Sequence, residues 1–223
     1  MSISGSKITY FGMPGRAEAA RLAFVIGGVQ FEDERIEFKD WGALKPNTPW
    51  GSMPFLTLSN GEQIAQSRNV LRFIGKHTNL YPLNDHLLAA KVDELLDVAD
   101  DLNNKVNATG RGLEKEAKEK LRFETSQQGG AVYEYLTKLE NFIAKNGANG
   151  YCVGSSLTVA DLAIAVHASN VISGFYDGIP PTMLDPFPNI QAVRKTVATQ
   201  EAVAAYYAAN PKFNATLAAA SDL

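Results

Sequence analysis

The sequence predicts an α/β domain followed by an all-helical domain. Strand-like apolar runs occur only in the first third of the 223 residues, whereas the rest shows helical periodicity almost throughout. Residues 77–86, between these two regions, carry two asparagines, a proline and an aspartate, a composition typical of a linker. We therefore predict domains at residues 1–80 and 86–223, each long enough to bury a core of its own.

The N-terminal domain is predicted to begin with a strand, a turn and a helix. A short apolar strand ends at Tyr10, the turn Gly12-Met-Pro-Gly15 follows, and residues 16–26 place apolar side chains on one broad helical face. Gly27 and Gly28 then supply a C-terminal stop. In such a unit the end of the strand and the start of the helix share a crevice, where side chains and N–H groups can meet a ligand.

The rest of this domain is predicted to contain a second strand, a hairpin and a second helix. Residues 30–36 alternate as an edge-like strand, and residues 38–51 are expected to be mostly loop because two prolines prevent a long helix. Residues 55–58 and 63–65 flank an Asn-Gly pair, the strongest short-range signal for a hairpin. A helix over residues 69–76 follows, with Ser67 suited to cap its start. The order β-α-β-loop-β-β-α is the topology of a thioredoxin-like domain.

The C-terminal region is predicted to hold helices at residues 87–108, 115–145, 158–173, 189–199 and 200–209. Thr158 and Asp161 have the spacing of a capping box, which marks them as folding residues and not catalytic ones. The first of these helices also carries an acidic series three or four positions apart, at Asp93, Asp97, Asp100 and Asp101. This series is either a solvated face or a face that meets cations from a ligand or a second subunit.

The composition argues against several classes of partner. The net charge of −3 leaves no basic footprint for nucleic acid, and the Lys-rich stretch at residues 114–120 alternates in sign. No apolar run approaches the length of about 20 residues that crosses a bilayer, and the N-terminus lacks the pattern of a signal peptide. The single cysteine, Cys152, excludes an intrachain disulfide. We therefore expect a cytoplasmic protein without nucleic-acid or membrane partners.

Neither the histidines nor the cysteine predict a metal site or a nucleophile. His77, His86 and His167 show no ligand spacing with Cys152 or with one another. The apolar neighbours of Cys152 favour a small buried residue over a reactive thiol.

Tyr10, at the exit of the first strand, is the first candidate for a functional residue. A phenol carries its proton at neutral pH and can donate one directed hydrogen bond. The alternative is that Tyr10 is simply a strand aromatic.

A second group of candidates borders the predicted hairpin. Met53-Pro54 comes directly before a strand, which suggests a cis turn that exposes the backbone of Met53 to a peptide in extended form. Gln66 offers amide donors, and Ser67 offers a hydroxyl at a helix N-terminus, which is a favourable place for a carboxylate.

Two residues of the preceding loop can reach a second carboxylate. Lys45 supplies an ammonium group and Trp41 an indole N–H. With the residues at the hairpin, they describe a site for a small extended peptide that has a carboxylate at each end and Tyr10 near its middle.

These motifs resemble the cytosolic glutathione transferases, and within them the sigma class, over nearly the whole chain. The resemblance is carried by Tyr10-Phe11, Gly15-Arg-Ala-Glu18, Arg21, Trp41, Lys45, Gly51-Ser-Met-Pro54, Gln66-Ser67, the aspartates at 97, 100 and 101, and Leu157-Thr-Val-Ala-Asp161. It implies a thioredoxin-like N-terminal domain, an all-α C-terminal domain, a homodimer, and glutathione as co-substrate with no metal required.

The resemblance also implies roles for individual residues. Tyr10 would bind the glutathione sulfur, with Arg16 close to the tyrosine hydroxyl. The other implied glutathione contacts are Trp41 and Lys45 at the glycine carboxylate, Met53 and Pro54 at the cysteinyl unit, and Gln66, Ser67 and a partner subunit's Asp101 at the γ-glutamyl end. The sequence departs from the class at Ser52, where glutamine is usual, and at Asn69, where a small apolar residue is usual.

The function implied by the resemblance is conjugation of the glutathione thiolate to small hydrophobic electrophiles, as in detoxification. We expect the electrophile pocket to be lined by Phe11, Met13, Asn104, Lys105 and Ala108. The identity of the electrophile stays open, as does whether Asp100 or Asp101 reaches the partner's site.

Two other functions remain alternatives at this point. One is a glutathione-dependent isomerase of the prostaglandin D synthase type, to which the sigma class is related. The other is a non-catalytic glutathione-binding protein, like the lens crystallins derived from this class. A thioredoxin-like oxidoreductase is disfavoured because no cysteine lies near the first strand-helix turn.

Overall fold

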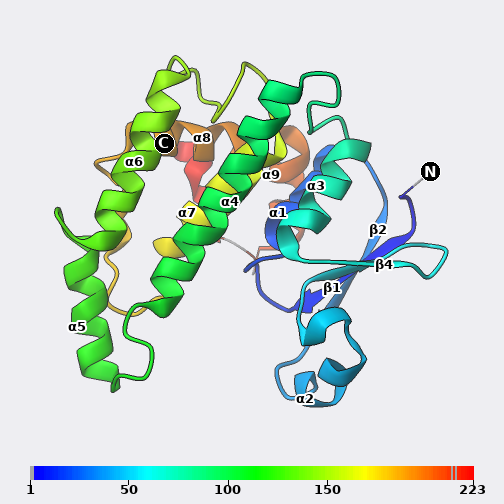
Figure 1. Ribbon diagram of the computed structural model, residues 1–223, viewed down its shortest axis with the longest axis horizontal. Coiled ribbons are helices and arrows are strands. Elements are labelled where there is room, and N and C mark those ends of the chain that lie inside the picture. The colour runs from blue at the N-terminus through cyan, green and yellow to red at the C-terminus, as the bar shows by residue number, and fades with distance from the viewer. Residues whose placement is uncertain (1–2, 212, 214) are drawn as a thin grey trace.

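The N-terminal domain is a four-stranded sheet with two helices packed on it. A computed structural model describes residues 3–211, 213 and 215–223 (Figure 1). In chain order the regular elements of this domain are β1 (Ser6–Phe11), α1 (Glu18–Ile26), β2 (Phe31–Ile36), α2 (Trp41–Leu44), β3 (Phe55–Thr57), β4 (Gln63–Ala65) and α3 (Ser67–His77). The strand order is β2-β1-β3-β4, with β1 and β2 parallel and the other pairs antiparallel. This is the thioredoxin-like arrangement that the sequence predicts.

The register of the sheet brings three candidate residues to one edge. Thr9 on β1 lies opposite Phe55 on β3, and Phe55 lies opposite Ala65 on β4. Because these pairs are antiparallel, the next residue outward on each strand reaches the same edge of the sheet. Tyr10, Pro54 and Gln66 therefore follow one another across the end of the sheet.

The segment between β2 and β3 is more regular than expected. Besides α2 it contains two 3₁₀ turns, η1 (Lys45–Asn47) and η2 (Pro49–Gly51). Pro46 and Pro49 each stand in the first turn of one of these short elements, where a missing N–H costs no hydrogen bond. The peptide between Met53 and Pro54 is cis, as the sequence predicts.

The start of α3 corrects one expectation. Gln66, not Ser67, occupies the N-cap position, with φ +71° and ψ +116°, and its side chain makes no capping hydrogen bond. Ser67 is the first helical residue. The N–H groups in the first turn of a helix have no partner within that helix. The N-terminus of α3 therefore presents free hydrogen-bond donors at the edge of the sheet.

The C-terminal domain is helical. Its elements are α4 (His86–Ala108), α5 (Lys115–Ser126), α6 (Ala131–Lys145), α7 (Val159–Val171), η3 (Pro181–Leu184), α8 (Pro188–Ala198), α9 (Glu201–Ala209), α10 (Ala215–Ala218) and η4 (Ala219–Asp222). The single helix expected at residues 115–145 is thus two helices, α5 and α6, which Figure 1 shows as separate rods. Gly129, at φ +83°, and Gly130 separate them.

Helix α7 forms the centre of this domain. Nearly all its side chains are buried, and it packs against α4, α8 and α1. Its start is held by the predicted capping box, in which the Asp161 carboxylate accepts the Thr158 N–H at 2.7 Å. Cys152 is also buried, and its N–H donates to Asp161 at 2.6 Å. Within the described part of the chain, no helix is long and apolar enough to cross a membrane.

Three arginines of the N-terminal domain meet the acidic series on α4. Arg72 pairs with Asp93 at 2.6 Å, Arg68 pairs with Asp97, and Arg16 pairs with Asp100. The cations for this face therefore come largely from the same chain. From the sequence we expected either a solvated face or cations from a ligand or a second subunit. The ion pairs join the two domains, and one of their arginines, Arg16, also lines the pocket described next.

Candidate functional site

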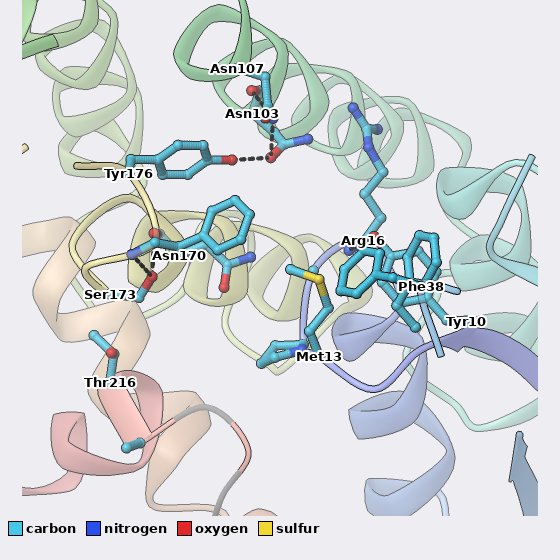
Figure 2. Close-up of a pocket in the computed structure, with 15 residues that line it drawn as sticks. Tyr10, Met13, Arg16, Phe38, Asn103, Asn107, Asn170, Ser173, Tyr176 and Thr216 are labelled. Carbon is cyan, nitrogen blue, oxygen red and sulfur yellow. Dashed lines mark hydrogen bonds between the residues drawn. The ribbon is translucent and has the colours of Figure 1, made fainter. Parts of the chain in front are cut away.

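A pocket of about 450 Å³ opens between the two domains at the end of β1. The N-terminal domain contributes the turn after β1 and Phe38, and the C-terminal domain contributes α4, the end of α7, the segment after it and the start of α10 (Figure 2). The lining residues are Tyr10, Phe11, Met13, Pro14, Gly15, Arg16, Phe38, Asn103, Asn107, Asn170, Ser173, Phe175, Tyr176, Ala215 and Thr216. One wall is therefore aromatic and aliphatic, and the facing wall is rich in amides and hydroxyls.

Tyr10 is 8% exposed and borders this pocket. Its hydroxyl oxygen accepts the backbone N–H of Arg16 at 3.3 Å. None of the described residues accepts the Tyr10 hydroxyl proton, so that this proton can be donated to a ligand. The close approach of the turn to the Tyr10 hydroxyl requires a glycine at position 15, because a Cβ there would clash with the hydroxyl oxygen at 2.7 Å.

The Arg16 side chain turns away from Tyr10 toward α4. Its guanidinium pairs with Asp100 and donates to the Asn104 amide oxygen at 2.6 Å. The contact of Arg16 with the Tyr10 hydroxyl is therefore made by its backbone. The contacts of the Arg16 side chain with α4 hold the Arg16 backbone in place. Arg16 thereby connects the C-terminal domain to the Tyr10 hydroxyl at the end of β1.

Arg21 holds the turn that carries these residues. Its buried guanidinium donates to the carbonyl oxygens of Met13 at 3.0 Å and Phe11 at 3.3 Å, and it pairs with Glu18 at 3.0 Å and Asp33 at 2.9 Å. The sequence indicated Arg21 only as a member of a motif. Its carbonyl contacts depend on the path of the turn, which periodicity does not predict.

The candidates for peptide binding lie outside the lining of the pocket, next to it. Trp41 is half-buried and meets the edge of the Phe11 ring at 5.9 Å between centroids. Lys45 is exposed. The backbone N–H and C=O of Met53 form no hydrogen bond with any described residue, so both are available to an extended ligand.

Gln66 and Ser67 stand at the free N–H groups of α3. Gln66 is exposed and Ser67 is half-buried. A non-glycine residue at positive φ stores backbone strain, which persists mainly where the surrounding structure or a function maintains it. Gln66 is such a residue. With Tyr10 and Pro54 it forms the sheet edge on which an extended ligand could lie.

Asp101 differs from the other members of the acidic series. It is exposed and forms no ion pair with a described residue, whereas Asp100 is engaged by Arg16. Burial, followed by the nearby Asp101 carboxylate, raises the pKa of Tyr135 to about 12. Of the two candidates for contact with a second subunit, Asp101 is therefore the one that remains available.

The structure brings a different face of α4 to the pocket than expected. Phe11 and Met13 line it, but Asn103 and Asn107 do so in place of Asn104, Lys105 and Ala108. Asn104 is taken by Arg16, and the Lys105 ammonium lies 5.4 Å from the centroid of the Tyr135 ring. One residue along a helix is a rotation of about 100°, so a shift of one position changes the surface that a side chain reaches.

Other lining residues were not indicated by the sequence, namely Phe38, Asn170, Ser173, Phe175, Tyr176, Ala215 and Thr216. A signal existed for two of them, because Asn170 and Ser173 are polar residues three positions apart at the end of the mostly apolar stretch that the sequence predicts as a helix at residues 158–173. The pocket holds few groups that could ligate a metal, and in the described ranges no cluster of three or more His, Cys, Asp or Glu side chains is suited to one.

Comparison with known proteins gives a consistent result over both domains. Residues 6–76 match the model described as "Glutathione S-transferase, N-terminal domain", and residues 100–210 match "Glutathione S-transferase, C-terminal domain". The chain is 40% identical over 164 residues to glutathione S-transferase 1 of Ascaris suum, which covers 71% of this chain and 76% of that protein.

Two further relatives cover nearly the whole chain. The chain is 31% identical over 206 residues to hematopoietic prostaglandin D synthase of Gallus gallus, covering 92% of this chain and 96% of that protein. The crystal structure of the glutathione S-transferase from Ascaris lumbricoides superposes with a TM-score of 0.78 at 32% identity, covering 94% of this chain and 99% of that one.

Proposed function

This chain belongs to the glutathione S-transferase family, and we propose that it is a sigma-class glutathione transferase whose Tyr10 hydroxyl activates the thiol. The observation that carries the proposal is the hydrogen bond from the Arg16 N–H to the Tyr10 oxygen at 3.3 Å. It fixes the oxygen at the mouth of an interdomain pocket and leaves the hydroxyl proton for the glutathione sulfur.

The energy needed for this activation is modest. A free thiol with a pKa of about 8.5 is only about 3% thiolate at pH 7. Lowering that pKa by about two units requires about 2.7 kcal/mol, and a hydrogen bond to a charged acceptor supplies about 1.5–3 kcal/mol. One phenol is sufficient, with Arg16 holding it in place.

The sheet edge supports the binding of glutathione as an extended peptide. The free N–H and C=O of Met53, next to Pro54, can pair with the cysteinyl unit. The N–H groups at the start of α3, with Ser67 and Gln66, would hold the γ-glutamyl carboxylate. Trp41 and Lys45 would hold the glycine carboxylate by an indole N–H and a positive charge.

The pocket supports the second half of the reaction. With glutathione on the sheet edge, its sulfur would lie at Tyr10, next to the apolar wall formed by Phe11, Phe38 and Met13. An electrophile in this pocket is held close to the thiolate, and such positioning can supply a large part of the rate enhancement. The proposed reaction is conjugation of small hydrophobic electrophiles, with no metal required.

We further propose that the protein works as a homodimer in the cytoplasm. The exposed Asp101, which forms no ion pair with a described residue, would reach the γ-glutamyl end of glutathione bound to a partner subunit. The amino group of glutathione is cationic, so a carboxylate at this place favours binding.

A glutathione-dependent isomerase of the prostaglandin D synthase type is a second candidate. The similarity to the Gallus gallus synthase over 92% of the chain favours it, as do the amides and hydroxyls on one pocket wall. Both reactions use the same thiolate. They differ in whether glutathione is consumed.

The purified protein, assayed with glutathione against aryl halides, isothiocyanates, peroxides and prostaglandin H, tests both candidates. Loss of free thiol together with a conjugate in the mass spectrum supports the transferase. Rearrangement of prostaglandin H without loss of thiol supports the isomerase. Glutathione binding without turnover of any compound would contradict both and favour a binding protein.

A further inference from the structure

Tyr135 on α6 lies beside Asp101, the one aspartate of the α4 series that forms no ion pair with a described residue. Helix α6 packs along α4 (Figure 1), and the Tyr135 hydroxyl donates to the Val98 carbonyl oxygen at 3.3 Å. Val98 stands about one turn before Asp101 on the same helix. Tyr135 does not line the interdomain pocket, so the proposed catalysis does not use it.

The interaction between Tyr135 and Asp101 leaves the carboxylate charged. Burial, followed by the charge of Asp101 and a hydrogen bond to its carboxylate, raises the pKa of Tyr135 to about 12. The phenol therefore keeps its proton at neutral pH and is a neutral donor. A neutral donor does not cancel the negative charge of Asp101, which stays available to a cation.

Lys105 is the cation that the sequence would place against Asp101. It stands four positions after Asp101 on α4, and side chains at this spacing are neighbours on the surface of a helix. An acidic residue four positions before a basic one favours an ion pair. No ion pair joins Asp101 and Lys105, however, and the Lys105 ammonium lies 5.4 Å from the centre of the Tyr135 ring instead.

The Tyr135 ring can hold Lys105 because the competing ion pair is weak. An exposed ion pair gains little in water, and an ammonium group over the face of a tyrosine ring gains a similar amount. The methylene groups of a lysine also bury apolar surface when they lie against a ring. Lys105 is half-buried, whereas Asp101 is exposed. The balance therefore favours the ring over the carboxylate.

We propose that Tyr135 is a positioning residue that keeps Lys105 away from Asp101, so that this carboxylate stays open for the amino group of glutathione bound to a second copy of the chain. The proposal rests on the proposed glutathione site and homodimer. It assigns part of the selectivity for the amino group to a side chain that does not touch the ligand. Because the carboxylate anchors already hold glutathione, its amine pairs with Asp101 at little further loss of freedom.

Two peptides measure this selectivity. Glutathione and glutaryl-cysteinylglycine differ only in the α-amino group, so the dissociation constant of the second divided by that of the first reports how well the amine is recognised. We expect Tyr135→Leu to lower this ratio about two- to fivefold, because Lys105 then pairs with Asp101 and competes with the amine. Tyr135→Phe keeps the ring and should leave the ratio near the wild-type value.

A second substitution separates competition by Lys105 from a packing defect. Adding Lys105→Met to Tyr135→Leu removes the competing cation and should restore the ratio to the wild-type value. A general loss of packing between α4 and α6 would not be repaired in this way. Lys138→Met, which removes an exposed lysine of α6, is the matched control and should not restore the ratio.

The contact between Lys105 and the ring can also be observed in the wild-type protein. The ring current of Tyr135 should shift the NMR signals of the Lys105 ε-methylene protons upfield, and Lys105→Met identifies these signals by their disappearance. This measurement decides the proposal even if Tyr135→Leu does not fold.

Three results would each overturn the role of Tyr135. They are a wild-type ratio in Tyr135→Leu, a lowered ratio that Lys105→Met does not restore, and Lys105 signals at their ordinary position in the wild-type protein. Equal binding of the two peptides by the wild-type protein would overturn it as well, because Asp101 would then not recognise the amine. Failure to bind glutathione at all would instead contradict the proposed function.

Discussion

We propose that the Ser67 side chain serves glutathione binding without taking part in the chemistry. It is the first residue of α3, beside the free N–H groups where the γ-glutamyl carboxylate would lie. We expect Ser67→Ala to raise the KM for glutathione more than it lowers kcat, because this carboxylate keeps its charge during the reaction. The loss of one charge-assisted hydrogen bond corresponds to about 1.5–3 kcal/mol of binding.

Steady-state kinetics with varied glutathione would measure this effect. Ser59→Ala, in the exposed turn of the hairpin, is a suitable control. A collapse of kcat at constant KM would rule out the anchoring role of Ser67.

His167 on α7 makes the stability of the fold depend on pH. Its Nδ1 is enclosed and has no hydrogen-bond partner among the described residues. Burial, followed by the charge of Arg16, lowers the pKa of His167 from 6.5 to about 4. In the unfolded chain the imidazole is protonated below its ordinary pKa, whereas in the folded chain it stays neutral down to about pH 4.

The folded state therefore loses stability as the pH falls from 6.5 toward 4, by up to about 3 kcal/mol. We expect His167→Gln to flatten this part of the pH dependence in urea unfolding, whatever its effect at pH 7. His86→Gln, at an exposed position, is the control. Equal slopes for His167→Gln and the wild-type protein would contradict the prediction.

At the scale of elements, the break between α5 and α6 depends on a close backbone contact. A Cβ on Gly130 would lie 2.5 Å from the Thr125 carbonyl oxygen and 2.6 Å from that of Glu124. We expect Gly130→Ala to destabilise the protein by about 1–3 kcal/mol, because backbone atoms must move to admit the methyl group.

Chemical denaturation would measure the change. Gly42→Ala is the matched control, since a Cβ on Gly42 meets no atom within 4 Å. If both substitutions have the same small effect, the close contact at Gly130 does not determine the break.

Most elements could be predicted from the sequence, because periodicity reports which side chains are buried. The hairpin at the Asn-Gly pair, the helix α1 and the capping box of α7 all follow from local signals. The break between α5 and α6 did not, because residues 115–145 keep a helical pattern on both sides of two glycines. The sequence also did not predict how α4 is rotated about its own axis. Asn103 and Asn107 line the pocket in place of Asn104, Lys105 and Ala108.

The residues of the candidate site also fall into those that the sequence could predict and those that it could not. Tyr10, Phe11, Met13 and Arg16 could be found because they belong to one continuous turn. Tyr176, Phe38 and Thr216 could not, because they reach the pocket from loops and from the end of the chain. Their positions depend on how the two domains pack.

At the scale of the whole molecule, the two domains are joined by ion pairs, one of which, between Arg16 and Asp100, also involves a residue of the pocket. Arg16, Arg68 and Arg72 use three of the four aspartates of α4. Asp101 forms no ion pair with a described residue, and we propose that it contacts glutathione bound to a second subunit. We expect Asp101→Asn to weaken glutathione binding about tenfold, through loss of one charge-assisted contact across the interface. The fold should be unaffected, because Asp101 is exposed.

Calorimetric titration with glutathione, together with light scattering, tests this prediction. Glu116→Gln, another exposed carboxylate but on α5, should bind as the wild-type protein does. A fully active monomer, or unchanged affinity in Asp101→Asn, would remove Asp101 from the site.

The proposed catalysis depends most on one hydrogen bond, which the Tyr10 hydroxyl would donate to the glutathione sulfur. Tyr10→Phe keeps the ring and removes this bond together with the hydrogen bond that the Tyr10 oxygen accepts from the Arg16 N–H at 3.3 Å. The proposed carboxylate anchors at Lys45 and Ser67 lie away from the sulfur. Glutathione should therefore still bind. The rate of conjugation near neutral pH should fall about ten- to hundredfold, and the difference should narrow at pH 9, where hydroxide ionises the thiol without help.

The most direct measurement is the thiolate absorbance of bound glutathione, titrated against pH in the wild-type protein and in Tyr10→Phe. The substitution should raise the pKa of the bound thiol by about one to two units, which corresponds to the loss of about 1.5–3 kcal/mol. Identical titration midpoints in the two proteins would contradict the account. The sulfur would then be activated by Arg16, a backbone donor or a helix dipole, and Tyr10 would be a packing residue of β1.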